Sequence, residues 1–218
     1  MSEATAELLS IVWRSVRVSG AAVIIAAAVG IPLGVWIGCR KFWGKSVVSA
    51  LVHTGMSLPP VVIGLLLYIL LSQSGPFAQL GWLFSEQAMI LAQALLALPF
   101  VVGITMNAVA SVPRELIRQV RGLGATDLQC LEAILREARA GVILAVAAAF
   151  GRSISEVGAV LIVGGNIAGH TRVLTTAIVL ETSKGRFEFA LALGAVLLTL
   201  ALLVNAAILR FQVSRVLP

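Results

Sequence analysis

Residues 18–39 read VSGAAVIIAAAVGIPLGVWIGC and contain no charged side chain. A helix needs about 20 consecutive, mostly apolar residues to cross the hydrocarbon core of a bilayer. The stretch also contains many small residues, which let helices approach closely in lipid. The whole chain is 59% hydrophobic and 12% charged, whereas an ordinary soluble domain is about 45–50% apolar and about 25% charged. Lipid is therefore the expected solvent.

The rest of the chain divides into further apolar runs separated by charged segments. We predict an all-α, polytopic membrane helix bundle that forms a single domain over residues 1–218. The predicted spans cover residues 15–39, 46–73, 87–112, 140–163 and 188–211. Glu3 and Glu7 in the first ten residues, without a small-residue cleavage pattern, are untypical of a signal peptide, so we expect the first helix to remain.

Two adjacent prolines interrupt the second predicted span. Pro59 and Pro60 remove two backbone donors and should kink or break the helix. A membrane tolerates such a break only where neighbouring protein or a cavity satisfies the freed carbonyl groups. We therefore expect this part of the span to face protein.

Charge in the loops predicts the orientation. If the N-terminus is outside, the cytoplasmic side carries ten basic residues: Arg40, Lys41, Lys45, Arg114, Arg118, Arg121, Arg136, Arg139, Arg210 and Arg215. The outer side carries five: Arg14, Arg17, Arg172, Lys184 and Arg186. This distribution follows the positive-inside rule. The net charge of +6 does not indicate nucleic-acid binding, because the basic residues lie between apolar runs and form no single stripe.

The segment 113–139 is the longest charged part of the chain, and we place it in the cytoplasm. It should contain an amphipathic helix that follows the helix-breaking residues Gly122 and Gly124 and is capped by Thr126 or Asp127. The apolar side of this helix would comprise Leu123, Leu128, Leu131, Ile134 and Leu135. Such a helix can transmit motion from a soluble partner, or it can lie on the lipid headgroups. The pattern alone leaves both possibilities open.

The same segment resembles the coupling loop of type I ABC importer permeases. The pattern of that loop is Glu-Ala-Ala, three residues, Gly, nine residues, Ile, one residue, Leu-Pro. Gly124 and Ile134 match at the right spacing, whereas Arg118-Gln119-Val120 replaces Glu-Ala-Ala and Arg136-Glu137 replaces Leu-Pro. The resemblance implies, by position, a contact with a separate ATPase through Arg121, Gly124, Ala125, Thr126, Asp127, Leu128, Leu131 and Ile134.

Other segments resemble the molybdate, tungstate and sulfate permease group, and the tungstate branch most of all. They are LPPVVIGL at 58–65, AQ at 92–93 through LP at 98–99, GRSISEVGA at 151–159 and GNIAGHTR at 165–172. The resemblance implies a homodimer in a bacterial or archaeal cell membrane. It also implies cytoplasmic ABC ATPase subunits that hold ATP and Mg²⁺, and a periplasmic or lipid-anchored solute-binding protein for an oxyanion.

Two alternatives remain at this point. The chain could be a permease for another small solute, such as an amino acid. It could also be a membrane scaffold or sensor that transports nothing, in which case the coupling-loop match is a coincidence.

Arg152 and Glu156 are ionisable residues within the fourth predicted span, where a charge costs at least about 2.5–3.5 kcal/mol. At i, i+4 spacing they share one helix face, with Ser155 nearby. They could form a structural pair that fixes helix packing. They could also line a translocation path, where Arg152 would compensate a passing divalent oxyanion by charge-assisted hydrogen bonds.

Gly164, Gly165 and Asn166 end the same span with a flexible backbone and exposed amide groups. This pattern suits a mobile outer gate, but it also suits a plain helix stop. The following segment, residues 167–188, is either a docking surface for the solute-binding protein or a solvated loop.

No catalytic or metal site is predicted in this chain. Gly164 with Gly169-His170-Thr171 has the spacing of a phosphate-binding loop but lacks its Lys, and Gly44-Lys45-Ser46 lacks the first Gly at the right place. Cys39 and Cys130 have no metal-ligand spacing. We expect no cofactor here and no ATP hydrolysis by this chain alone.

Overall fold

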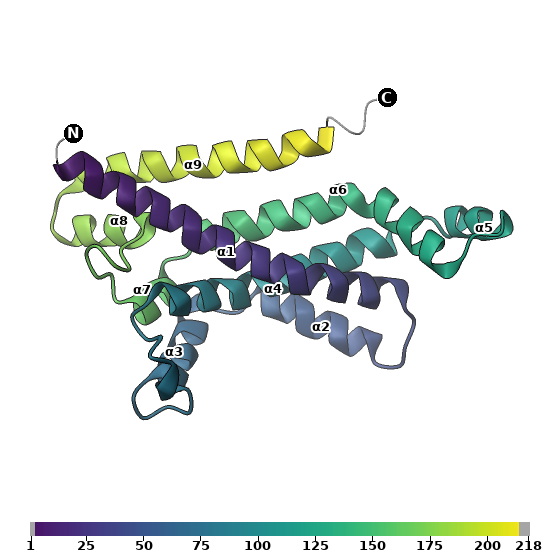
Figure 1. The fold of residues 1–218 in the computed structure, drawn as a ribbon, viewed down its shortest axis with the longest axis horizontal. Coiled ribbons are helices and arrows are strands. Elements are labelled where there is room, and N and C mark those ends of the chain that lie inside the picture. Colours follow the sequence, from purple (N-terminus) through teal and green to yellow (C-terminus); the bar gives the residue numbers. More distant parts are fainter. Residues whose placement is uncertain (1–2, 214–218) are drawn as a thin grey trace.

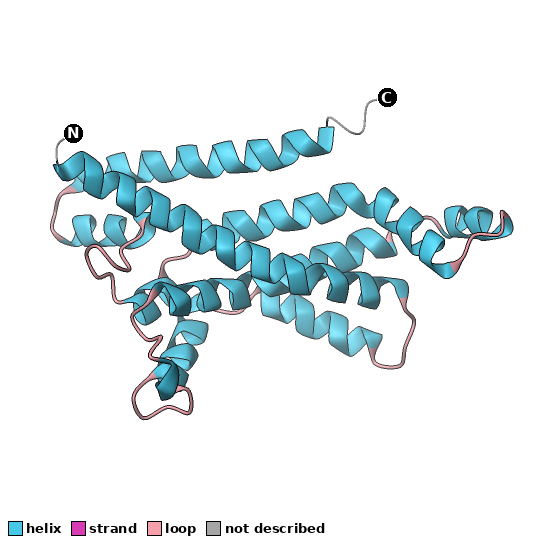
Figure 2. Cartoon of the chain, viewed as in Figure 1, coloured by secondary structure: helices cyan, strands magenta, loops and turns pink. Residues whose placement is uncertain are grey.

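The computed structural model describes residues 3–213, and within this range it contains helices and loops but no strand (Figure 2). The predicted all-α helix bundle is therefore confirmed. Arg215, one of the ten basic residues assigned to the cytoplasmic side, lies outside the described residues.

Helices follow one another with short connections. They are α1 (Glu3–Cys39), α2 (Lys45–Met56), α3 (Pro60–Leu71), the 3₁₀ helix η1 (Ala78–Leu80), α4 (Glu86–Ala110), α5 (Arg114–Gly122), α6 (Asp127–Ile154), α7 (Gly158–Gly164), α8 (Leu174–Ser183) and α9 (Phe187–Val213). Figure 1 shows α1, α2, α4, α6 and α9 running along the long axis, with α5 at one end and α7 and α8 at the other. The long helices thus connect two ends of the bundle.

The centre of the bundle is α4, which packs against α1 on one side and α6 on the other. In its most apolar stretch, 61% of the residues are buried inside the chain, against 6% in the corresponding stretch of α9. Both helices are apolar enough to cross a membrane. The buried helix therefore forms the core, whereas α9 presents its apolar side chains to the surroundings.

Glycines on α1 permit its close contact with α4. Gly30, Gly34 and Gly38 recur at every fourth position, so they share one helix face. A Cβ atom added at Gly34 would lie 2.8 Å from both Thr105 Cβ and the Val102 carbonyl oxygen. Larger residues would push the helices apart, as expected for packing through small residues in lipid.

Two bends break the predicted spans. The second predicted span is two helices, α2 and α3, with an angle of 93° between them. Pro59 is the residue before α3, and Pro60 is the first residue of that helix, where proline needs no hydrogen-bond acceptor for its missing N–H. An angle of 57° separates α6 from α7. Within residues 3–213, three helices are long and apolar enough to cross a membrane, and the number of spans rises to five if each bent pair counts as one.

One helix connects the amphipathic segment to the fourth predicted span. The sequence predicts an amphipathic helix within residues 113–139, capped by Thr126 or Asp127, and a span at residues 140–163. Instead, α6 continues without a break from Asp127 to Ile154. The alanine-rich sequence after residue 137 favours helix, and Gly141 lies against α4 so closely that an added Cβ would be 2.3 Å from the Ala108 Cβ.

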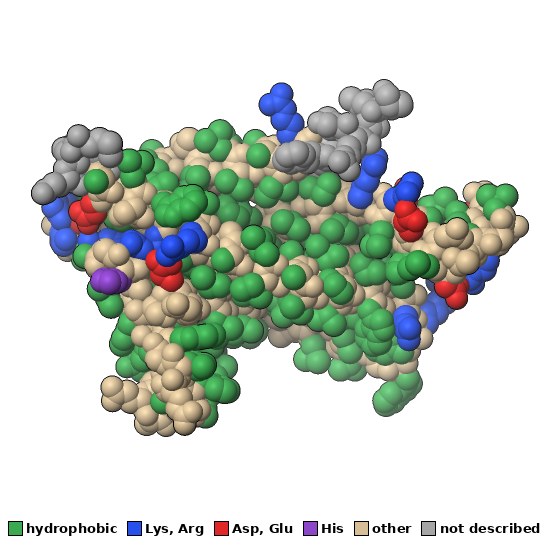
Figure 3. Space-filling view, viewed as in Figure 1, with side chains coloured by type: hydrophobic (Ala, Val, Ile, Leu, Met, Phe, Trp, Pro, Cys, Tyr) green, Lys and Arg blue, Asp and Glu red, His purple; other side chains and the backbone are tan. Residues whose placement is uncertain are grey.

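Charged side chains gather at the two ends of the long axis, and the surface between them is mostly hydrophobic (Figure 3). One end holds α5 and the start of α6, where Val35, Val109 and Ile134 form a common core cluster. The other end holds the N-terminal part of α1, the start of α4 and the α7–α8 connection. The separation suits a molecule whose middle lies in lipid.

Candidate functional site

The junction between α5 and α6 is the first candidate region. Gly124 adopts a left-handed conformation with φ of 84°, which glycine adopts without steric cost. Thr126 then caps α6: its backbone N–H donates to Gln129 Oε1 at 2.8 Å, and its hydroxyl oxygen accepts from the Gln129 N–H at 3.4 Å. This reciprocal capping box fixes where α6 begins.

Exposed charges connect the two helices at this junction. Arg121 donates to the Asp127 carboxylate at 2.8 Å, and both side chains are mostly exposed. None of the α5 residues is buried, and Ala125 is half-buried. The junction is therefore accessible along most of its length, as a surface for a soluble partner must be.

The apolar side chains of this segment do not form the single face that the sequence predicts. Ile134 is buried with α1 and α4, and Leu131 packs against the same cluster. Leu123 and Leu128, by contrast, are 89% and 76% exposed, and Leu135 is also exposed. The reason is that α6 continues into the bundle, so α1 and α4 cover Leu131 and Ile134 and leave the other apolar side chains exposed. Leu123 and Leu128 remain as the apolar contacts that a partner can reach.

The bend between α6 and α7 is the second candidate region, and Glu156 lies at its centre. The Glu156 carboxylate accepts from Arg152 at 2.7 Å and from the Ala159 N–H at 3.0 Å, and its carbonyl oxygen accepts from the Thr175 hydroxyl at 2.9 Å. Glu156 is only 3% exposed. Its carboxylate therefore joins the end of α6 to the start of α7, and its backbone holds α8 in place.

The sequence predicts that Arg152 and Glu156 lie within one continuous span. In the structure, the helix ends between them. The helix ends at Ile154, and the exposed Ser155 donates to the carbonyl oxygens of Gly151 and Arg152. Such bonds from a side chain compete with the helical ladder. The contact between Arg152 and Glu156 persists across the break. The Arg152 side chain keeps 25% of its surface exposed, so the arginine, and not the glutamate, is the charge that a solute could meet.

A tight turn follows α7. Gly165 and Asn166 both have positive φ, 69° and 51°. The Thr171 hydroxyl donates to the Gly164 carbonyl oxygen and accepts from the Ile167 N–H. An added Cβ at Gly165 would lie 2.8 Å from the ring of Phe84. The residues predicted as a gate thus form a defined turn, packed against the segment before α4.

An ion cluster next to this turn was not predicted from the sequence. Glu86, at the start of α4, pairs with Arg14 at 3.0 Å and also with Arg17, both from α1. Arg14 in addition donates to the carbonyl oxygens of Gly169 and Arg172. The loop after α7 is thereby tied to α1 and α4. The sequence shows only that these charges flank apolar runs, which does not reveal their pairing.

The two candidate regions lie at opposite ends of α6. This helix has 28 residues, which corresponds to about 42 Å at 1.5 Å per residue. Among the described residues, no group of three His, Cys, Asp or Glu side chains could hold a metal ion. The two candidate regions are thus connected by one continuous helix.

Comparison with known proteins explains this arrangement. The family described as binding-protein-dependent transport system inner membrane component matches residues 30–216. The chain belongs to this family. The permease is 48% identical over 210 residues to the probable anion ABC transporter permease protein of Haloferax volcanii, covering 94% of this chain and 90% of the relative. It is 44% identical over 206 residues to the tungstate uptake system permease protein TupB of Peptoclostridium acidaminophilum, with the same coverage.

A solved structure shows the same fold. A chain of the inward-facing methionine ABC transporter MetNI superimposes on the permease with a TM-score of 0.75 at 22% identity, covering 96% of this chain and 98% of that one. The resemblance to type I importer permeases is confirmed. As a member of this family, the permease is a membrane transport component that works with ATPase and solute-binding partners.

Proposed function

We propose that this permease forms the translocation path for a tetrahedral oxyanion, with tungstate as the first candidate and molybdate or sulfate as the others. The observation that carries the proposal is the identity of 48% and 44% to an anion permease and a tungstate permease, over nine tenths of each relative. The methionine transporter supports the fold alone, at 22% identity. An amino-acid substrate therefore has no comparable support.

The proposed mechanism uses α6 as a rigid connection. The ATPase subunits, which bind ATP and Mg²⁺, would grip the junction around Gly124 and Thr126 through the exposed Leu123 and Leu128. Closure of the ATPase dimer would move that end of α6 as a rigid body. Because the helix is unbroken, the displacement would reach Arg152 and the bend at its other end. This permease would contribute no ATPase site of its own.

Arg152 would meet the oxyanion at the bend. A guanidinium is always charged and binds tetrahedral oxyanions with paired N–H donors. Glu156 would hold Arg152 in place, and the turn at Gly164, Gly165 and Asn166 would act as the outer gate. The contact between Arg152 and Glu156, at 2.7 Å, supports positioning, since a fixed arginine loses less entropy when it binds an anion.

A homodimer with the N-terminus outside completes the proposal. The exposed apolar side chains of α3, among them Val61, Leu65 and Ile69, supply surface for a second copy in the membrane. The end of the bundle with α5 carries most of the basic residues, which the positive-inside rule places in the cytoplasm. The solute-binding protein would then meet the opposite end, which includes residues 167–188.

Uptake into proteoliposomes tests the proposed substrate. The permease is reconstituted with its ATPase and solute-binding subunits, and internal tungstate, molybdate and sulfate are measured by mass spectrometry. We expect ATP-dependent accumulation of tungstate. Accumulation that continues without ATP, or uptake of methionine but of no oxyanion, would show that the proposal is wrong.

Arg152→Lys, which keeps the charge but loses the guanidinium fork, should transport more slowly than the unchanged permease and faster than Arg152→Ala.

A second experiment tests coupling. Gly124→Val should keep the protein inserted while ATP hydrolysis no longer drives uptake, because a β-branched residue is strained at φ of 84°. Gly122→Ala is the matched control, since Gly122 is the last helical residue of α5 and nothing lies within 4 Å of an added Cβ. Normal coupling in Gly124→Val would remove the junction from the mechanism.

A cysteine in place of Thr126 tests the proposed orientation. If a reagent that does not cross the membrane labels this cysteine from outside intact cells, the orientation is wrong.

A further inference from the structure

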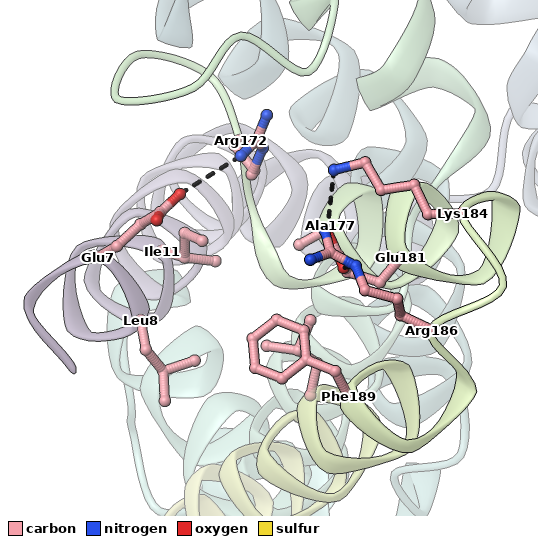
Figure 4. A pocket seen from close by; sticks show the side chains of 10 residues that line it. Glu7, Leu8, Ile11, Arg172, Ala177, Glu181, Lys184, Arg186 and Phe189 are labelled. Atoms are coloured by element: carbon pink, nitrogen blue, oxygen red, sulfur yellow. Dashed lines mark hydrogen bonds and ion pairs between the residues drawn. The ribbon is translucent and has the colours of Figure 1, made fainter. Parts of the chain in front are cut away.

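A pocket of about 290 Å³ opens between α1, α8 and α9, at the end of the bundle that carries the N-terminal part of α1. Figure 4 shows that its walls differ in character. The charged side chains of Arg172, Lys184 and Arg186 lie along one side, and the apolar side chains of Leu8 and Phe189 lie along the other. The proposed translocation path at Arg152 does not include these residues, although Arg172, Lys184 and Arg186 fall within the segment proposed to meet the solute-binding protein.

The charges of the pocket do not cancel. Its lining contains three cations, Arg172, Lys184 and Arg186, and two carboxylates, Glu7 and Glu181. Glu181 is buried and is held by Lys184 at 3.3 Å and by Arg186 at 2.6 Å. Two cations thus surround one buried carboxylate. The excess of positive charge attracts an anionic group.

Arg172 is the cation best able to take up that group. Its guanidinium contacts Glu7 at 3.3 Å, but the Glu7 side chain is 58% exposed. Because the Glu7 carboxylate is the exposed partner, water competes for it, and an incoming anion can displace it from Arg172. The Nε atom of Arg172 is buried and has no hydrogen-bond partner among the described residues. A buried donor without a partner is a cost that a bound acceptor would remove.

The apolar side of the pocket continues toward the middle of the bundle. On α9 the lining passes from Phe189 to Leu193, one turn further along the helix. On two of the helices that line the pocket, Trp13 of α1 and Phe187 at the start of α9 are largely exposed. Aromatic side chains are enriched where a membrane protein passes the headgroup region. The pocket therefore lies at a level where polar headgroups meet acyl chains.

We propose that this pocket binds an anionic phospholipid, with the headgroup phosphate on Arg172, Lys184 and Arg186 and the first part of an acyl chain against Leu8, Phe189 and Leu193. Charge-assisted hydrogen bonds from guanidinium groups suit a phosphate. A free oxyanion would use the cationic side only. The bound lipid would connect α1 to the α8–α9 hairpin.

Native mass spectrometry of the full chain in detergent tests the proposal. Dioleoyl phosphatidylglycerol is the anionic probe, dioleoyl phosphatidylcholine has the same chains with a neutral headgroup, and inorganic phosphate has no chains. We expect phosphatidylglycerol to be retained at least about fivefold more than phosphatidylcholine at equal concentration. Inorganic phosphate should not displace it at concentrations equal to that of the lipid.

Two variants with opposite expected effects locate the site. Arg172→Gln should lower retention of phosphatidylglycerol about fivefold, and Glu7→Gln should raise it, because the competing carboxylate is lost. The matched controls are Arg136→Gln and Glu132→Gln, which change the same charges in an exposed pair on α6. If the control variants change the retention of phosphatidylglycerol as much as Arg172→Gln and Glu7→Gln do, the proposal is wrong. So would efficient displacement by inorganic phosphate, which would identify the ligand as a free oxyanion.

Discussion

The two ends of α6 are built in different ways. At its start, Arg121 and Asp127 form an exposed pair, and α5 has no buried residue. At its end, Glu156 is buried, and hydrogen bonds from α6, α7 and α8 converge on it. The first turn of α6 is thus exposed and held by local contacts, with burial against α1 and α4 starting further along at Ile134, whereas the last turn is held by contacts among several elements.

This difference indicates where each end obtains its rigidity. A buried, fully hydrogen-bonded charge strongly favours a single arrangement, because any loss of a partner leaves an uncompensated group in a medium of low dielectric constant. An exposed pair imposes little, since water and salt compete with it. The contacts at Glu156 therefore restrict the bend more strongly than the exposed pair restricts the α5–α6 junction.

The largest effect is expected for Glu156→Ala. The substitution leaves Arg152 without its counter-charge and the Ala159 N–H without its acceptor. Breaking a buried ion pair on one side costs about 3–5 kcal/mol. We expect a decrease of that size in the free energy of unfolding, measured by circular dichroism in mixed micelles.

The control for this substitution is at the exposed end. Glu132→Ala breaks the ion pair with Arg136, and both side chains of this pair are mostly exposed. The free energy of unfolding should therefore fall by at most about 1 kcal/mol. Similar losses in the two variants would mean that the two ends of α6 are held equally, and the comparison would fail.

Gly165→Ala should have the next largest effect. An alanine at φ of 69° is strained by about 1–2 kcal/mol, and its Cβ would lie 2.8 Å from the Phe84 ring, which adds about 1–3 kcal/mol for overpacking. Gly169→Ala is the matched control, because φ there is 75° but nothing lies within 4 Å of an added Cβ. The difference between the two losses of stability measures the contact with Phe84. If the two variants lose the same stability, the ring does not hold the turn.

The sequence predicts the helices better than the joints between them. The apolar runs and Pro59-Pro60 are local features, and the bundle and the first bend follow from them. The second bend has no proline. It arises because Ser155 and Glu156 bind nearby backbone groups, and the sequence does not show which way their side chains turn. The change to charged residues at 113–139 suggests a helix boundary, but α6 continues because its backbone hydrogen bonds are internal to the helix and need no change where charged side chains give way to apolar ones.

The pairing of Arg14 with Glu86 could not be predicted from the sequence, for another reason. The two residues are 72 positions apart, and no periodic pattern connects them. Their contact depends on the packing of α1 against α4. The residues predicted to contact the ATPase, by contrast, form one continuous segment, so a resemblance in sequence can suggest them without any knowledge of the packing.

Arg14→Lys tests this cluster, with Arg17→Lys as its control. Arg14 donates to Glu86 and to two carbonyl oxygens, whereas Arg17, whose side chain is 53% exposed, pairs with Glu86. A lysine cannot reproduce a planar fork with several donors, so carbonyl groups in the loop lose their partners. We expect a loss of about 1–3 kcal/mol for Arg14→Lys and less than about 1 kcal/mol for Arg17→Lys. Equal losses would show that charge alone, and not geometry, holds the loop.

The smallest effect is expected for the pair at the other end of α6, and a double-mutant cycle of Arg121→Gln and Asp127→Asn measures it. Exposed pairs have coupling energies of about 0.2–1 kcal/mol, and this energy should fall further at 1 M salt, where the screening length is about 3 Å. The Thr126 capping box is untouched by either change, so α6 should begin at the same residue, and the helical signal should be unchanged. A coupling energy above about 2 kcal/mol that salt does not reduce would mean that the junction is rigid without a partner. The proposed ATPase would then move an already fixed element, and the difference between the two ends of α6 would be one of exposure only.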